Sequence, residues 1–298
     1  MIILRKPAVA AITVAGALLA ASGATAVGSP RLTAATTSTP QLTVKMSGKN
    51  SLHVRVPRKL KAGRVAVKLV AGRGEQAFVI LRLHGAYSPQ DLAEDVKTFD
   101  AAGDQPTPQA LKALRRVVRK TTFYGGLDSG SGHAVVHGTV ALPKSGTYYV
   151  VNDSEGPNFD APVVRLQVRA KSGSRRPAPA SQATVRATSR DRFHGAVNLP
   201  ASGTVTFENV SARSPHLMFL QHVKTGTTRK QLLKALRRNR PGPFRPGGVG
   251  VTELSPGRSA TVTYDLPAGD YAEVCFFPDL KTGRPHAFMG MVRIVHLA

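Results

Sequence analysis

Cys275 is the only cysteine in a chain of 298 residues. A lone cysteine in an exported protein is expected to be a metal ligand, to form an intermolecular disulfide or to be a buried inert thiol. Its neighbours in the sequence favour the first of these. His216 precedes it, and His286 and Met291 follow it. Two imidazoles, one thiolate and a weak axial thioether make up the donor set of type 1 copper.

The surrounding pattern predicts the elements that must position these donors. His216 begins an apolar strand, and Cys275 ends another strand. His286 and Met291 lie in the connection to a final strand at 292–297. In a β-sandwich, such a connection can bring donors that are distant in sequence to one end of the sheets.

Short motifs around these donors resemble those of the plastocyanin family of cupredoxins. Residues 214–219 (SPHLMF) are similar to the family's Pro-His-apolar-apolar-Phe entry to the first ligand strand. Residues 269–275 (GDYAEVC) fit Gly-x-Tyr-x-x-x-Cys, and residues 290–295 (GMVRIV) fit Gly-Met-Val-x-x-Val. The resemblance covers the segment 182–298 and implies a cupredoxin fold there.

The resemblance also implies a ligand set for one copper ion. His216, Cys275 and His286 would be the strong ligands and Met291 the weak axial one. The ten residues between Cys275 and His286 make a longer loop than plastocyanins have. This loop leaves Met289 as a second, less favoured axial candidate.

Most catalytic interpretations lack the residues that they need. The trinuclear cluster of a multicopper oxidase requires His-x-His pairs, and the sequence contains none. We find no further histidine set for a two-domain nitrite reductase. Cys275 with His216 or His286 as a base fits the spacing of a nucleophile, but it leaves residues 290–295 unexplained. We therefore expect that the chain is not an enzyme.

The two halves of the chain match each other in order. The matched segments are 63–83 with 203–223, 110–116 with 232–238, 145–152 with 268–275, and 163–168 with 291–296. An internal duplication explains this order. It predicts two cupredoxin-like domains, at 41–170 and 182–298, joined by a Pro/Ser/Arg-rich linker at 171–181.

The first half lacks the donor set under this alignment. The replacements are Gln76 for His216, Asn152 for Cys275, Asn158 for His286 and Val163 for Met291. We therefore expect the first domain to be free of copper and to act as a structural unit or a binding surface.

Hydrophobic patterning predicts an all-β fold with one or two inserted helices in each domain. Residues 184–188, 204–210 and 259–266 are β-branched or alternate apolar with polar residues, as half-buried strands do. Residues 227–240 form an amphipathic helix, and residues 88–99 begin another at the N-cap Ser88. The architecture expected is a pair of tandem Greek-key β-sandwiches.

The N-terminus predicts export. Arg5 and Lys6 precede an apolar run that ends before the small residues Ala24-Thr25-Ala26, so residues 1–26 are typical of a cleaved signal peptide. Residues 27–40 form a Ser/Thr/Pro-rich leader that we expect to be disordered. No later stretch is apolar enough to cross a membrane. We expect a secreted or cell-surface protein.

The formal net charge of +24 indicates which kinds of partner the protein could bind. Such a surface favours anionic cell-wall polymers or lipid head groups, although a solvated basic face needs no specific ligand. Specific nucleic-acid binding is not expected, because the basic residues are scattered and aromatic residues are few. Nothing in the sequence identifies a redox partner.

Three functions remain open. The first is a blue-copper protein that carries electrons or handles copper at the cell surface. The second is a metal-free module that binds the cell surface or wall through its basic face on a cupredoxin scaffold. The third is a chaperone that binds only Cu(I).

Overall fold

The computed structural model describes residues 41–48, 50–130, 134–154, 163–170, 179–238 and 242–298. The predicted signal peptide, the leader and most of the predicted linker lie outside these residues. Within the described part, strands β1 to β18 dominate and only helices α1 to α4 interrupt them. The prediction of an all-β fold with a few inserted helices is confirmed.

The described residues of the first half form nine strands and two helices. The strands are β1 (Gln41–Met46), β2 (His53–Arg55), β3 (Gly63–Ala71), β4 (Phe78–Leu83), β5 (Thr121–Phe123), β6 (Leu127–Asp128), β7 (Ala134–Leu142), β8 (Gly146–Asn152) and β9 (Val164–Val168). The helices are α1 (Pro89–Asp100) and α2 (Pro108–Lys120). Helix α1 begins as predicted, because the Ser88 side chain accepts from the backbone N–H of Asp91.

The described part of the second half also contains nine strands and two helices. Its strands are β10 (Ala183–Ala187), β11 (Phe193–His194), β12 (Asn198–Leu199), β13 (Ser202–Asn209), β14 (His216–Val223), β15 (Phe244–Leu254), β16 (Arg258–Asp265), β17 (Gly269–Val274) and β18 (Val292–Leu297). Its helices are α3 (Arg229–Arg237) and α4 (His286–Met289). Helix α3 buries Leu232 and Leu236 and leaves Leu233 half-buried, as its apolar stripe predicts.

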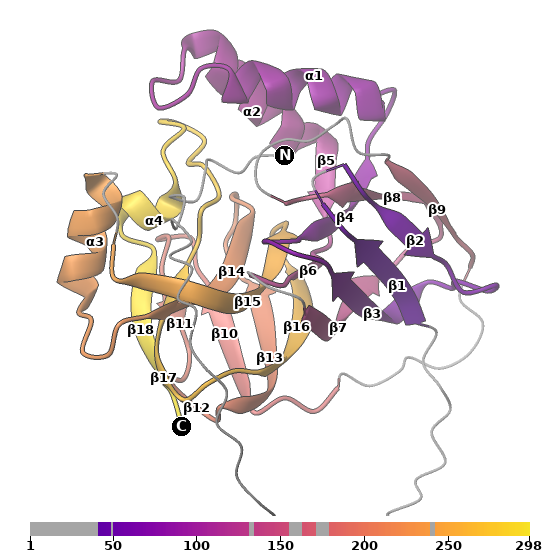
Figure 1. Ribbon diagram of the computed structural model, residues 1–298. Helices are drawn as coiled ribbons and strands as arrows, with labels where there is room; N and C mark the ends of the chain where they lie inside the picture. Colours follow the sequence, from indigo (N-terminus) through magenta and orange to yellow (C-terminus); the bar gives the residue numbers. More distant parts are fainter. Residues whose placement is uncertain (1–40, 49, 131–133, 155–162, 171–178, 239–241) are drawn as a thin grey trace, which may run out of the picture.

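One sheet runs through both halves in the order β11-β10-β13-β16-β7-β3-β1-β2. Each half supplies four adjacent strands, and each includes one parallel pair, β1 with β3 and β10 with β13. Strands β7 and β16 pair antiparallel at the centre, so equivalent strands follow in the same order on either side. The halves therefore share a continuous hydrogen-bonded layer (Figure 1).

Two further sheets pack against this layer. One has the order β5-β4-β8-β9 and belongs to the first half. The other has the order β12-β18-β17-β14-β15-β6, so β6 of the first half completes the sheet that contains β14 and β17. Strand β14 lies between β17 and β15 in this sheet and is buried along most of its length.

Buried and partly buried residues alternate along strands of the shared layer, as the sequence pattern predicts. In β3 the side chains of Val65, Val67 and Leu69 are buried, and the intervening residues are only partly buried.

The close contact between β7 and β16 at the centre of the layer requires a glycine at Gly138 of β7. A Cβ atom there would lie 2.1 Å from the carbonyl oxygen of Thr261 on β16.

Candidate metal centre

Three of the predicted donors meet at one end of the second half. His216 is the first residue of β14, Cys275 follows β17 directly, and His286 is the first residue of α4. The Sγ atom of Cys275 lies 3.7 Å from Nδ1 of His216 and 3.7 Å from Nδ1 of His286. All three side chains are fully buried. Within the described part of the chain, no other group of three such donors is this compact.

Strand pairing brings the first two donors together. Strands β14 and β17 are antiparallel neighbours, with Phe219 opposite Val274. Because β14 starts at the end of the sheet where β17 finishes, His216 and Cys275 lie at the same end of these two strands. The alternation of side chains along each strand then directs both donors to the interior.

Backbone hydrogen bonds fold the third donor back onto the other two. The N–H of His286 donates to the carbonyl of Phe277 at 3.0 Å, and the N–H of Ala287 donates to the carbonyl of Cys275 at 2.7 Å. Gly290 then adopts a φ of 115°, a conformation that favours glycine. This turn lets the N–H of Met291 donate to the carbonyl of His286 at 2.9 Å.

The long loop before His286 does not separate the donors, because its extra residues form a closed turn. The N–H of Asp279 donates to the carbonyl of Arg284, and the N–H of Gly283 donates to the carbonyl of Asp279. The carboxylate of Asp279 accepts from the backbone N–H groups of Lys281 and Thr282. The loop is therefore compact, and its length is compatible with the site.

Helices from both halves hold this connection in place. Arg229 of α3 donates to the carbonyls of Gly290 and Val292 at 2.7 and 2.8 Å. From the first half, Arg115 of α2 donates to the carbonyl of Leu280 at 2.9 Å. Figure 1 shows the yellow chain before α4 rising towards α1 and α2.

The two methionine candidates differ in burial. Met291 is fully buried, and its backbone carbonyl accepts from the N–H of Cys275 at 3.3 Å. The side chain of Met289 is 39% exposed, and its sulfur lies 3.8 Å from the hydroxyl of Thr282. Of the two, only Met291 is buried and hydrogen-bonded through its backbone to Cys275.

The spacing of the three strong donors fits a shared metal ion. Sulfur and nitrogen donors about 2.3 and 2.0 Å from one ion, spread at about 110–120°, lie about 3.5–3.8 Å apart. The observed separations of 3.7 Å fall in this range. A thiolate with two imidazoles is also the donor chemistry that suits copper. The residues present therefore fit the ion that the resemblance implies.

Burial keeps the donors neutral. Desolvation, together with a smaller effect of the neighbouring His286, lowers the pKa of His216 to about 3. Burial likewise lowers the pKa of His286, against the opposing effect of Asp191 and Asp279. Burial raises the pKa of the Cys275 thiol to about 12, although the N–H groups of Leu217 and Phe277 favour the thiolate. A bound metal must therefore displace the thiol proton.

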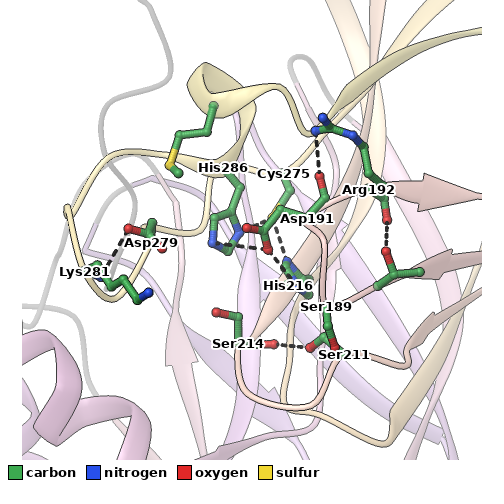
Figure 2. A network of polar contacts seen from close by, with 12 residues as sticks. Ser189, Asp191, Arg192, Ser211, Ser214, His216, Cys275, Asp279, Lys281 and His286 are labelled. Carbon is green, nitrogen blue, oxygen red and sulfur yellow. Dashed lines mark hydrogen bonds and ion pairs between the residues drawn. The ribbon is translucent and has the colours of Figure 1, made fainter.

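Asp191 also belongs to this site, and no sequence motif marks it. Its Oδ1 atom lies 3.7 Å from Nε2 of His216 and 3.8 Å from Nε2 of His286 (Figure 2). Burial raises the pKa of its carboxyl, and His286 opposes that shift. Asp191 comes from the loop between β10 and β11, outside the motifs that flank the donors.

In the described part of the first half, two of the positions that the sequence alignment matches with the donors hold amides. Gln76 and Asn152 are both buried. Gln76 donates to the carbonyl of Arg73, and its side-chain oxygen accepts from the Ser154 hydroxyl at 3.4 Å. The side-chain oxygen of Asn152 accepts from the N–H of Ser154 at 2.9 Å. Val163 is half-buried, and Asn158 lies outside the described residues.

None of the helices in the described ranges is long and apolar enough to cross a membrane.

Comparison with known proteins found similarity only among solved structures. No protein-family model and no curated protein matches the chain. Auracyanin B is 22% identical, with a TM-score of 0.27, over 39% of this chain and 86% of that one. The auracyanin of Roseiflexus castenholzii is 21% identical, with a TM-score of 0.27, over 39% and 94%.

A copper nitrite reductase from Nitrosomonas europaea aligns over more of the chain. It is 10% identical, with a TM-score of 0.24, over 87% of this chain and 93% of that one. Because these identities and TM-scores are low, the site is interpreted only from its own residues and distances.

Proposed function

We propose that the second half of the chain binds one copper ion. Sγ of Cys275 and Nδ1 of His216 and His286 would hold it, and Met291 would be a further, weaker donor. The observation that carries this proposal is the buried thiol, 3.7 Å from both imidazole nitrogens. A bound copper ion would supply one-electron chemistry, through its Cu(I) and Cu(II) states.

The role of the protein is to hold the donors and exclude water. The donors are fully buried, and their connection is closed by the hydrogen bonds around Ala287 and Gly290. A fixed donor set favours electron transfer, because little has to move between the two oxidation states. We therefore propose electron transfer or copper handling at the cell surface, without catalysis, for a secreted protein whose redox partner is unknown.

Copper binding is tested with the purified, metal-free protein. Adding Cu(II) should produce an intense thiolate-to-copper absorption near about 600 nm, as His₂Cys sites do. The Cys275→Ser variant should stay colourless. The matched control is Met289→Leu, which changes an exposed side chain in the same connection and should keep the colour.

Two other results would point elsewhere. A colourless protein that binds one equivalent of Cu(I), and loses it in Cys275→Ser, would be a Cu(I) chaperone. A protein that binds neither ion would refute the copper proposal.

The second candidate function is a metal-free module that binds anionic surfaces. The net charge of +24 favours it. Binding to vesicles that contain anionic lipid, or to an anionic wall polymer, should weaken as the salt concentration rises. If this is the function, Cys275→Ser should bind these surfaces as tightly as the unsubstituted protein does.

A further inference from the structure

The far sides of the two ligand imidazoles are buried and lack ordinary partners. In the described part of the chain, neither Nε2 of His216 nor Nε2 of His286 has a hydrogen-bond partner. Both rings are fully buried, with their centroids 4.8 Å apart. A buried ring N–H without an acceptor is destabilising, because it has lost its hydrogen bonds to water. These two nitrogens therefore require a nearby acceptor.

Asp191 is placed to be that acceptor for both rings. Its Oδ1 atom lies within ion-pair distance of the two Nε2 atoms, at 3.7 and 3.8 Å. Figure 2 shows the Asp191 carboxylate close to the rings of His216 and His286. These distances are just beyond an ordinary hydrogen bond and too short to admit a bridging water.

The loop that carries Asp191 is built to hold it there. Asp191 has a φ of 51°, and it is the only non-glycine residue with positive φ in the described part of the chain. Its N–H donates to the carbonyl of Thr188 at 3.0 Å, which closes the turn. Ser189 accepts from the N–H of Ala212 at 2.9 Å, which ties the turn to the segment before β14. A left-handed aspartate is uncommon and is kept here by its surroundings.

We propose that Asp191 is a positioning residue for the metal centre, whose carboxylate oxygen lies close to Nε2 of both His216 and His286 and electrostatically favours a proton on each of these nitrogens. This contact fixes both imidazoles in the tautomer that leaves the Nδ1 lone pairs facing the Cys275 sulfur. The opposite tautomer would direct a ring lone pair at the carboxylate and an N–H at the sulfur. Partners that receive the second N–H of a ligand histidine commonly tune metal affinity in this way.

The tautomer is measured in the metal-free protein, so this test does not depend on copper being bound. Long-range ¹H–¹⁵N NMR at a pH where both rings are neutral should show Nε2–H for His216 and His286. The Asp191→Gly variant should lose this uniform tautomer while it keeps the turn, because glycine accepts a φ of 51°. Asp191→Asn, whose amide oxygen still accepts, should restore it in part.

The matched control removes a different Asp–His contact from the same half. Asp270 lies 3.0 Å from Nδ1 of the exposed His296, away from the donors. Asp270→Ala should leave the ring signals of His216 and His286 as they are in the unsubstituted protein. Amide spectra establish that each variant is folded. If Asp191→Gly does not fold, the unsubstituted protein and Asp191→Asn decide the question.

Metal affinity provides the second readout, and it rests on the proposed function. In competition with a Cu(I) chelator, Asp191→Gly should bind Cu(I) about 10–100-fold more weakly. Nδ1–H in either ring of the unsubstituted protein, or unchanged tautomers and affinity in Asp191→Gly, would overturn the positioning role and leave copper binding intact. Nε2–H in both rings of a protein that binds no copper would instead refute the proposed function alone.

Discussion

At the scale of the residue, this molecule buries several groups that are normally ionised. Asp153 and Glu253 are 1% and 0% exposed. Burial raises the pKa of both, and the charge of Glu253 raises that of Asp153 further. A hydrogen bond between their side chains also raises the pKa of Asp153 and lowers that of Glu253. The charge of Asp128 also raises the pKa of both groups.

Because of these carboxyl groups, we expect the free energy of unfolding to fall as the pH rises. In the unfolded chain both groups lose their protons near pH 4. The folded protein keeps these protons to a higher pH. Their contribution to the free energy of unfolding is therefore fully present below the unfolded pKa and is lost as the pH rises through the folded pKa. The slope for one proton is at most about 1.4 kcal/mol per pH unit.

Glu253→Gln should therefore flatten this dependence and make the protein relatively more stable above neutral pH. Denaturant unfolding of the metal-free protein across a pH series measures the slope. Glu208→Gln, at a half-exposed carboxylate that pairs with Arg186, is the control and should keep the original slope. A Glu253→Gln curve parallel to the original would show that the buried pair does not cause the dependence.

At the scale of the element, α3 holds the connection that carries two of the proposed ligands. The guanidinium of Arg229 bonds to the carbonyls of Gly290 and Val292, which flank Met291. Hydrogen bonds to a charged group contribute about 1.5–3 kcal/mol each. The helix thus fixes the turn after His286 from outside the sheet.

Arg229→Met should loosen this connection. We expect a loss of stability of about 1–3 kcal/mol and faster hydrogen exchange at residues 286–292. Hydrogen-exchange mass spectrometry locates the change, and Lys230→Met at the next exposed position of the helix is the control. Equal exchange in both variants would mean that the arginine does not hold the connection.

At the scale of the whole molecule, the halves are joined through the pairing of β7 with β16. Further contacts reinforce this junction. Thr252 donates to the carbonyl of Phe78 at 3.0 Å, and the rings of Phe123 and Phe277 meet edge to face at 6.4 Å. The first half therefore supports the sheet and the connection that contain the candidate site.

Gly138→Val should break this junction. The new side chain would start 2.1 Å from the carbonyl oxygen of Thr261, so the two strands would have to separate. We expect a destabilisation of about 3 kcal/mol or more, measured by denaturant unfolding. Val135→Ala, at a 55% exposed position of the same strand, should change the stability by less than about 1 kcal/mol. A small effect of Gly138→Val would argue against close pairing at the centre of the layer.

The sequence by itself predicted most of the strands and helices and the candidate donors. Strands are predictable from the alternation of apolar residues, and the start of α1 from Ser88, because these signals are local. The order of His216, Cys275 and His286 likewise follows from short motifs. Local signals of this kind do not depend on how the chain packs.

Only the tertiary structure decided which distant groups meet. It showed that the three donors converge, that Met291 is buried while Met289 is exposed, and that Asp191 reaches both imidazoles. It also joined the two halves through β7 and β16. Each of these facts depends on strand register and packing between segments far apart in the chain, which no local pattern specifies.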